Sequence, residues 1–303
     1  MKNITTITAA FLAAASTIAA SAADAPAPAV TFDGYAVVTA ATTNTTPSTS
    51  TLDLNAAKFG ATGKFGAVTG YASVYYNGTT TDLLDAYASV DAGSGFTVTV
   101  GKFLSYMGYE AFDVPNMAQI SYANTQLAPI PAYHTGIKLD YSGATSGAGI
   151  AVVDSLYGAS LYKGDGDLKK PGLEAYYTYK GIKDTTIWFG VADEVSTKKA
   201  FYDLWVSYSI NKTDSLGAEV IKIESEGVLW LLAYTKGLTP KVSLTSRISG
   251  DSPTGGSSNL KYTLAPSYTV NDHFLVRAEV SYVSSFGTTP AATTFAAQSI
   301  FKF

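Results

Sequence analysis

The sequence predicts an all-β fold, a transmembrane antiparallel β-barrel of about 16 strands, within a range of roughly 12 to 18. Three observations predict it. Apolar and polar residues alternate in segments of about ten residues, the length at which a tilted strand crosses a bilayer. Charged residues make up 15% of the chain, against roughly a quarter in soluble domains. Short and long connections alternate along the chain, as they do in a membrane barrel that has short turns at one end and longer loops at the other.

The first 23 residues have the pattern of a cleaved secretory signal peptide. The positive charge of Lys2 precedes a short apolar run, and Ser21-Ala22-Ala23 forms a small-residue cleavage site. A buried or membrane-spanning helix is the alternative, but the run is shorter than the roughly 18 apolar residues of a membrane helix. The expected division is a signal peptide at 1–23, a short lead-in at 24–30 and one barrel domain at 31–303.

The expected strands are joined by connections that differ between the two ends of the barrel. Every second connection is a turn of about two to four residues, for example 182–183 and 270–271. The others are mostly longer, and the longest is 105–132. A soluble sandwich or propeller has no reason to sort its loops in this way, so the pattern favours an outer-membrane barrel with periplasmic termini. The expected strands are 31–41, 51–61, 66–77, 82–91, 95–104, 133–142, 147–157, 172–181, 184–193, 201–211, 214–224, 227–236, 239–249, 259–269, 272–283 and 293–303.

The two faces of single strands indicate a barrel in lipid. In the segment 133–141 one face carries Ile137 and Leu139, and the other carries Lys138 and Asp140. A soluble barrel has the same period but places its charges outward. The signal peptide, the pattern of loops and the scarcity of charge favour lipid on the apolar side.

Two segments, 51–61 and 214–224, alternate poorly. Lys102 and Lys222 fall on the expected lipid face near strand ends, where a lysine can extend its ammonium group to the membrane interface. A β-bulge that changes the face of the following residues is the other interpretation.

The chain ends in an alternating apolar segment that includes Phe301 and the terminal Phe303. This pattern resembles the C-terminal signature of bacterial outer-membrane barrels, which the barrel-assembly machinery reads. The resemblance implies that machinery and outer-membrane lipid as partners. The net charge of −4, with lysines and arginines scattered along the chain, gives no indication of nucleic acid binding.

The segment 105–132 is the long interruption of the strand pattern. Gly108, Pro115, Pro129 and Pro131 exclude a long regular element. A connection of about 28 residues is usually functional or disordered, and its many aromatic and aliphatic residues argue against disorder. We expect it to fold into the lumen as the third loop of the long-loop end. The sequence leaves open whether it narrows the barrel or plugs it.

The same region resembles a known family. Its motif is Gly101-Lys102-Phe103 followed by Gly108-Tyr109-Glu110, and the similarity continues through Asn116 and Ser121-Tyr122 to His134-Thr135-Gly136. These residues resemble the OmpL-like β-barrel porins of Gram-negative bacteria. The resemblance implies passive diffusion of small hydrophilic solutes and ions across the outer membrane, and a homotrimer by analogy with porins of this size. It assigns no role to the motif residues.

A barrel of this width encloses water unless it is plugged, so its inward charges would shape conductance. Four basic residues from three successive expected strands would form a basic wall. Glu110 and Asp113 of the loop would face this wall across a constriction and set a transverse field. The alternative is that the charges solvate a wide lumen and pair with their neighbours. The candidate pore-lining residues are Glu110, Asp113, Lys138, Asp140, Glu279 and the four of the basic wall, Lys241, Arg247, Lys261 and Arg277.

Hydrolysis and metal chemistry find little support in the sequence. The two histidines, His134 and His273, are expected inside the barrel, and Ser252 lacks the G-x-S-x-G context of a nucleophile. Asp165 and Asp167 could touch Ca²⁺, but the spaced ligands of a calcium loop are missing. We therefore expect no enzyme activity, metal or cofactor. Two alternatives stay open: a structural or surface-binding barrel that does not conduct and, with weaker support, an outer-membrane barrel hydrolase.

Overall fold

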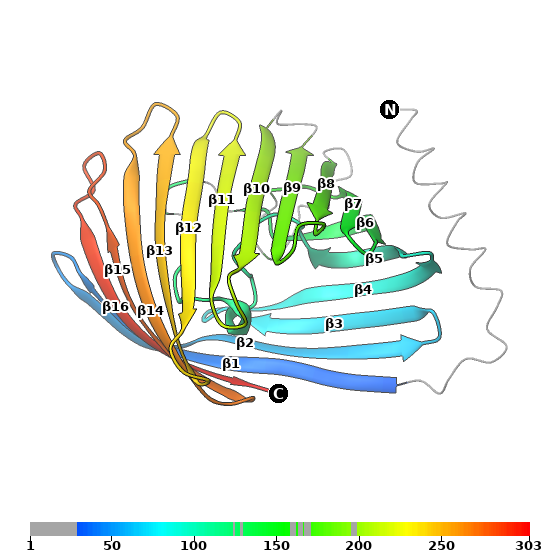
Figure 1. Cartoon of the computed structure of the whole chain (residues 1–303), viewed down its shortest axis with the longest axis horizontal. Coiled ribbons are helices and arrows are strands. Elements are labelled where there is room, and N and C mark those ends of the chain that lie inside the picture. The colour runs from blue at the N-terminus through cyan, green and yellow to red at the C-terminus, as the bar shows by residue number, and fades with distance from the viewer. Residues whose placement is uncertain are drawn as a thin grey trace.

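The computed structural model describes residues 29–303, apart from 124, 128–129, 158–161, 163–165, 167–170 and 195–198. Within this part of the chain, sixteen antiparallel strands form a closed barrel. Figure 1 shows how the strands follow one another around it. The predicted fold class is confirmed. The strands are β1 (Ala29–Asn44), β2 (Thr49–Phe65), β3 (Val68–Tyr76), β4 (Thr81–Gly93), β5 (Phe96–Leu104), β6 (Tyr133–Ser142), β7 (Ser146–Val153), β8 (Gly172–Tyr179), β9 (Thr185–Glu194), β10 (Lys199–Ser209), β11 (Ser215–Ile223), β12 (Gly227–Gly237), β13 (Val242–Pro253), β14 (Asn259–Asn271), β15 (Phe274–Val283) and β16 (Ala292–Lys302).

Every expected strand has a counterpart, with ends that differ by a few residues. The first strand begins at Ala29, within the expected lead-in, and the first connection is 45–48 instead of 42–50. The difference in connection length between the two ends of the barrel is therefore smaller than expected, although the connection 105–132 is still much longer than the turns. The expected signal peptide lies outside the described residues, as do Asp165 and Asp167 of the possible Ca²⁺ turn. None of the helical segments that the structure describes is long and apolar enough to cross a membrane.

The strands turn apolar side chains outward and polar ones inward. In β11, Glu219 is buried, whereas the next residue, Val220, is 50% exposed. The outer surface is consequently an apolar band of the kind that lipid requires. Among its large exposed side chains are Phe32, Phe59, Leu204, Leu232, Phe295 and Phe301.

Bulges explain one of the two poorly alternating segments. The pairing of β1 with β2 shifts where Val37 faces Ala56 and Val38 faces Leu54, which makes Asn55 the extra residue of a bulge within 51–61. By contrast, β11 pairs with β10 and β12 without a shift, and Lys222 is exposed on its outer face. The bulge interpretation therefore holds for the first segment and fails for the second.

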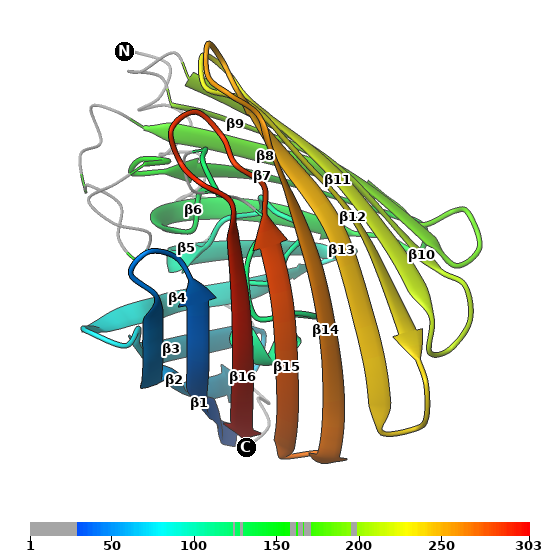
Figure 2. The same ribbon diagram turned by 90° about the vertical axis from the view of Figure 1, so that its left-hand side faces the viewer.

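The barrel closes where the last strand meets the first. Figure 2 shows β1 and β16 side by side, and their register begins with Tyr35 opposite Lys302. Next to this pair, Gly34 and Phe303 exchange two backbone hydrogen bonds of 3.2 and 3.0 Å. A Cβ on Gly34 would lie 2.7 Å from the Cζ atom of Phe303 and would also press on the carbonyl oxygen of Lys58. A glycine at 34 thus lets the terminal phenylalanine pack against the first strand.

We expect Gly34→Val to destabilise the closed barrel, because the new side chain would displace the ring of Phe303. Overpacking of this kind costs about 1–3 kcal/mol. The measurement is the temperature at which the folded mobility is lost in gel electrophoresis of unheated samples. Gly70→Val is the matched control, since a Cβ at Gly70 meets no atom within 4 Å. Equal loss in the two variants would contradict this role of Gly34.

Candidate functional site: the loop inside the barrel

The segment 105–132 is called the inner loop below. Its described residues leave the end of β5 and lie inside the barrel, as Figure 1 shows. Its described residues include one regular element, the short 3-10 helix η1 (Val114–Asn116). Its backbone is too irregular to satisfy its own polar groups, and a buried amide without a partner costs free energy. The barrel wall supplies these partners from strands β8 to β15.

Five carboxylates of the wall accept hydrogen bonds from the inner loop, mostly from its backbone N–H groups. Hydrogen bonds to a charged acceptor are stronger than neutral ones, so each carboxylate fixes a short piece of the loop. The bonds run from Ser105 Oγ and Tyr106 N to Glu174 (2.6 and 3.2 Å), from Gly108 N to Asp203 (2.8 Å), from Tyr109 N to Glu219 (2.6 Å), from Ile120 N, Ser121 N and Ser121 Oγ to Glu279 (2.6, 3.1 and 2.6 Å), and from Thr125 N and Gln126 N to Asp251 (2.9 and 3.1 Å).

Three wall cations bind the carbonyl groups of the same loop. They complement the carboxylates, because a loop backbone offers both donors and acceptors. Arg247 also forms an ion pair with Glu110, whose other carboxylate oxygen accepts the N–H of Ala123 at 2.7 Å. The carbonyl contacts are Arg277 to Met117 and Gln119 (2.5 and 3.0 Å), Arg247 to Ser121 and Tyr122 (2.8 and 3.2 Å), and Lys261 to Tyr122 (2.7 Å).

The loop crosses the lumen at Asp113 and reaches the opposite wall. Lys58 of β2 lies 3.2 Å from Asp113 and 3.2 Å from Asp85 of β4, and it bridges the two carboxylates. The hydroxyl of Tyr35 donates to Asp113 at 3.0 Å. Sequence reasoning missed Lys58, because the bulge at Asn55 sets the face of this part of β2.

The predicted opposed charges meet in direct contact instead of facing each other across an open gap. Arg247 binds Glu110, and Asp113 binds Lys58 and not the basic wall. The inclusion of Lys241 is wrong: it lies exposed in the turn before β13 and donates to the carbonyl of Val270 at 3.1 Å. The strand begins at Val242, so Lys241 has no place on the inner face.

Lys138 and Asp140 lie on β6, further along the strand from the inner loop. The ammonium group of Lys138 is 4.9 Å from the ring centre of Phe103 and 5.1 Å from that of Tyr106. Asp140 accepts from the hydroxyl of Tyr176 at 3.3 Å. Burial raises the pKa of Tyr106, and the charge of Asp140 raises it further. Lys138 and Asp140 thus lie near the start of the inner loop, but they are not among the carboxylates and cations of the wall that bind its backbone.

The family motif marks the passage from strand to loop. Gly101 has a φ of 132°, and a Cβ there would lie 2.6 Å from the Cα of Tyr87, so the neighbouring strand requires a glycine. Gly108 has a φ of 101° and gives its N–H to Asp203. Tyr109 packs its ring 5.6 Å from Trp205. In the same motif, Lys102 contacts the carbonyl of Leu83, Phe103 is buried, and Glu110 forms the ion pair described above.

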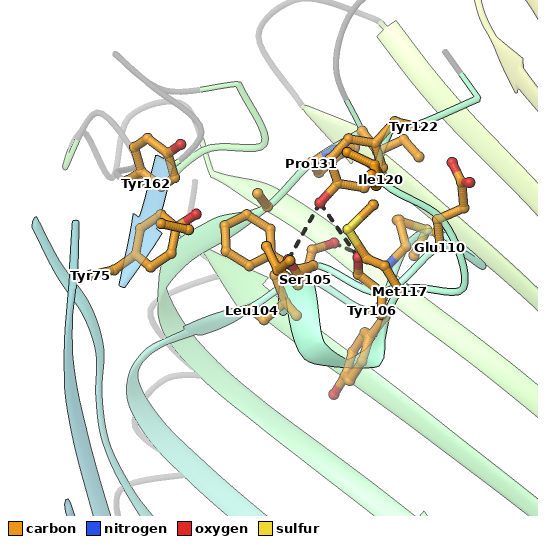
Figure 3. A pocket seen from close by; sticks show the side chains of 18 of the residues that line it. Tyr75, Leu104, Ser105, Tyr106, Glu110, Met117, Ile120, Tyr122, Pro131 and Tyr162 are labelled. Atoms are coloured by element: carbon orange, nitrogen blue, oxygen red, sulfur yellow. Dashed lines mark hydrogen bonds between the residues drawn. The ribbon is translucent and has the colours of Figure 1, made fainter. Parts of the chain in front are cut away.

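The inner loop leaves space beside it. A cavity of about 530 Å³ lies beside the loop. Residues of β2, β3 and β16 line it, and so do Leu104 of β5, Glu219 of β11 and Leu229 of β12. Figure 3 shows Tyr75 and Tyr162 on one side of this cavity, and Ile120, Tyr122 and Glu110 on the other. Burial raises the pKa of Tyr122 to about 12, so its hydroxyl stays neutral at physiological pH.

Neither a metal site nor a catalytic triad is found among the described residues. They contain no cluster of three or more side chains that could hold a metal ion. His134 lies 3.3 Å from Glu174, but Ser105 donates to the same carboxylate and not to the imidazole, which a nucleophilic serine would need. The other histidine, His273, is exposed and contacts the carbonyl of Lys302.

We expect Glu279→Ala to loosen the second half of the inner loop, because three hydrogen bonds to one carboxylate are lost. Each such bond contributes about 1.5–3 kcal/mol, so opening should become at least about tenfold more frequent. The measurement is the rate of limited chymotrypsin cleavage within 105–132. Asp33→Ala is the control, since Asp33 accepts from Tyr71 on the wall. The role of Glu279 is refuted if both variants are cleaved as slowly as the unmodified protein.

Comparison with known proteins agrees with this architecture. The sequence matches the family model described as "Putative beta-barrel porin-2, OmpL-like" over residues 35–221. No curated protein matches the chain in sequence. Similar solved structures include the outer membrane channel DcaP of Acinetobacter baumannii (TM-score 0.70, 10% identity, 91% of this chain and 97% of that chain). They also include an anion-selective porin from Comamonas acidovorans (0.68, 12%, 91% and 100%) and the trimer form of OmpT, an outer membrane protein of Vibrio cholerae (0.67, 13%, 92% and 100%).

At these identities the structural likeness concerns the fold, whereas the family model covers more than half of the chain. The closed barrel, the apolar outer band and the loop inside the lumen are consistent with that family. The chain therefore belongs to the OmpL-like β-barrel porin family and is a porin of the bacterial outer membrane.

Proposed function

We propose that this porin is a passive diffusion channel for small hydrophilic solutes and ions, and that its inner loop narrows the lumen without closing it. The observation that carries the proposal is the cavity of about 530 Å³ beside a firmly attached loop. A plug would be expected to fill the space on both sides of its crossing point. A barrel of sixteen strands is also too wide for wall side chains alone to fill.

The charges around the constriction indicate weak ion selectivity. The cations Arg247, Lys261 and Arg277 are buried against the loop, where they bind its carbonyl groups. Asp113 keeps 33% of its side chain exposed at the crossing point, beside the buried Lys58. Charges that are paired in contact produce a smaller field in the remaining opening than charges held apart.

We further propose a homotrimer, lipid contact and recognition by the barrel-assembly machinery. The trimer form of the similar Vibrio cholerae protein supports the first proposal. The exposed apolar band supports the second, and Phe303 at the barrel seam supports the third. We also propose cleavage of the first 23 residues on export, and transport without enzymatic activity.

The direct test is single-channel recording from refolded residues 24–303 in a planar bilayer. We expect discrete, long-lived conductance steps. A verified folded barrel without steps would contradict the open-channel proposal and favour a plugged or structural barrel.

Replacing residues 109–126 by a flexible Gly-Ser linker of about ten residues should raise the conductance about twofold or more, because the segment crosses the lumen. If conductance appears only after the replacement, the inner loop is a plug. An unchanged conductance would show that the loop does not limit the current. Folded mobility on an unheated gel controls for damage to the barrel.

Lys58→Gln should shift the channel toward cations, because Asp85 and Asp113 lose the cation that bridges them. The measurement is the sign and size of the reversal potential under a salt gradient. Lys241→Gln removes the same charge from the exposed turn and should leave the potential nearly unchanged. Equal shifts would show that the channel senses total charge and not the charge at the crossing point.

A further inference from the structure

The cavity beside the inner loop differs in chemistry from the charged contacts that hold the loop. One part of its wall is aromatic: Tyr75 of β3 lies 5.9 Å from Phe112 of the loop and 5.6 Å from Tyr162, between ring centres. Phe112 in turn meets Tyr133 edge-on at 5.0 Å. The rings of Tyr75, Phe112 and Tyr162 pack against one another at the edge of the cavity, so they form a wall and not a cage. The apolar lining is completed by Val114, Met117, Ile120 and Ile130.

A few polar groups reach this cavity. Asn55, the bulge residue of β2, lines it, and its Oδ1 accepts from Thr39 at 2.8 Å. Its Nδ2 makes no hydrogen bond to any other described residue. Tyr122 also lines the cavity, and its hydroxyl makes only long contacts of 3.4 Å with two loop carbonyls. The cavity thus offers an amide donor and a phenol next to an apolar wall.

No lysine or arginine is among the described residues that line the cavity, and its charged members are Glu110 and Glu219. Both carboxylates already have partners: Glu110 binds Arg247, and Glu219 accepts the N–H of Tyr109. An anion would therefore meet two carboxylates and no cation. An organic cation would find Glu110 already paired with Arg247, and Glu219 already bound to the N–H of Tyr109. The lining favours uncharged solutes.

We propose that this cavity binds small uncharged solutes that carry a flat aromatic ring and one hydrogen-bonding group, and that they cross the constriction through it. The volume falls within the roughly 300–1,000 Å³ of small-molecule sites, which are mostly apolar with a few placed polar groups. The ring would stack on Tyr75 and Phe112 in an offset or edge-on arrangement, and an acceptor on the solute would take the Nδ2 donor of Asn55. This inference rests on the proposed channel function.

Benzamide is a suitable probe, since it has one ring and one neutral amide. Added to a conducting channel, it should reduce the current reversibly and in a saturable way. Benzoate, which has the same shape and a negative charge, should block at least about tenfold more weakly. Sorbitol at equal concentration controls for viscosity, because it has no ring.

The variant that tests the site is Tyr75→Leu, which removes one ring of the wall. It should raise the half-blocking concentration of benzamide about threefold to tenfold, as expected for the loss of one aromatic contact. Tyr71→Leu is the matched control: Tyr71 lies on the same strand and faces the same lumen, but it contacts Asp33 instead of the cavity. Its half-blocking concentration should change by less than about twofold.

Ligand-observed saturation-transfer NMR on the folded barrel gives a second readout that does not need conduction. Binding of benzamide that Tyr75→Leu weakens and Tyr71→Leu preserves would support the site even in a channel that conducts poorly. Normal conductance steps with equal effects of benzamide, benzoate and sorbitol would overturn the site and leave the channel function intact. Binding with no conductance in any variant would instead contradict the channel and the passage of solutes through it.

Discussion

The architecture depends on the satisfaction of a loop backbone inside a membrane barrel. A long irregular segment in a lumen must find partners for its N–H and C=O groups or lose the free energy of their hydration. Carboxylates on β8, β10, β11, β13 and β15 accept the N–H groups, and cations on β13, β14 and β15 bind the carbonyls. These carboxylates and cations are buried against the loop that they hold.

This division gives the lumen two unlike sides. The strands from β8 to β15 hold the inner loop with charged groups. The strands β2, β3 and β16 face it across the remaining cavity and present mostly tyrosine, alanine and amide side chains. Lys58 and Asp113 connect the two sides at a single crossing point. Charge therefore fixes the position of the loop, while the space that is left is lined mostly by neutral side chains, together with Glu110 and Glu219.

Much of the fold could be predicted from the sequence, because strands in lipid have a period of two and nearly constant length. The inward folding of 105–132 also followed from its apolar residues. The details of the constriction could not be predicted in the same way. One bulge at Asn55 sets which face of β2 carries Lys58, and one short turn removes Lys241 from the inner face. The cavity brings together Tyr75, Phe112 and Tyr162, which lie far apart in the sequence and carry no shared pattern.

The inner loop is attached mainly through its backbone, and this has a consequence for how such channels can diverge. Every amino acid except proline presents the same N–H group to Glu279 or Glu219, so most loop side chains can be exchanged without loss of the attachment. The side chain of Ile120 can vary in this sense, because its N–H still donates to Glu279. Evolution, or a protein engineer, could thus change what the opening accepts by substituting loop residues while the barrel and its charged wall remain unaltered.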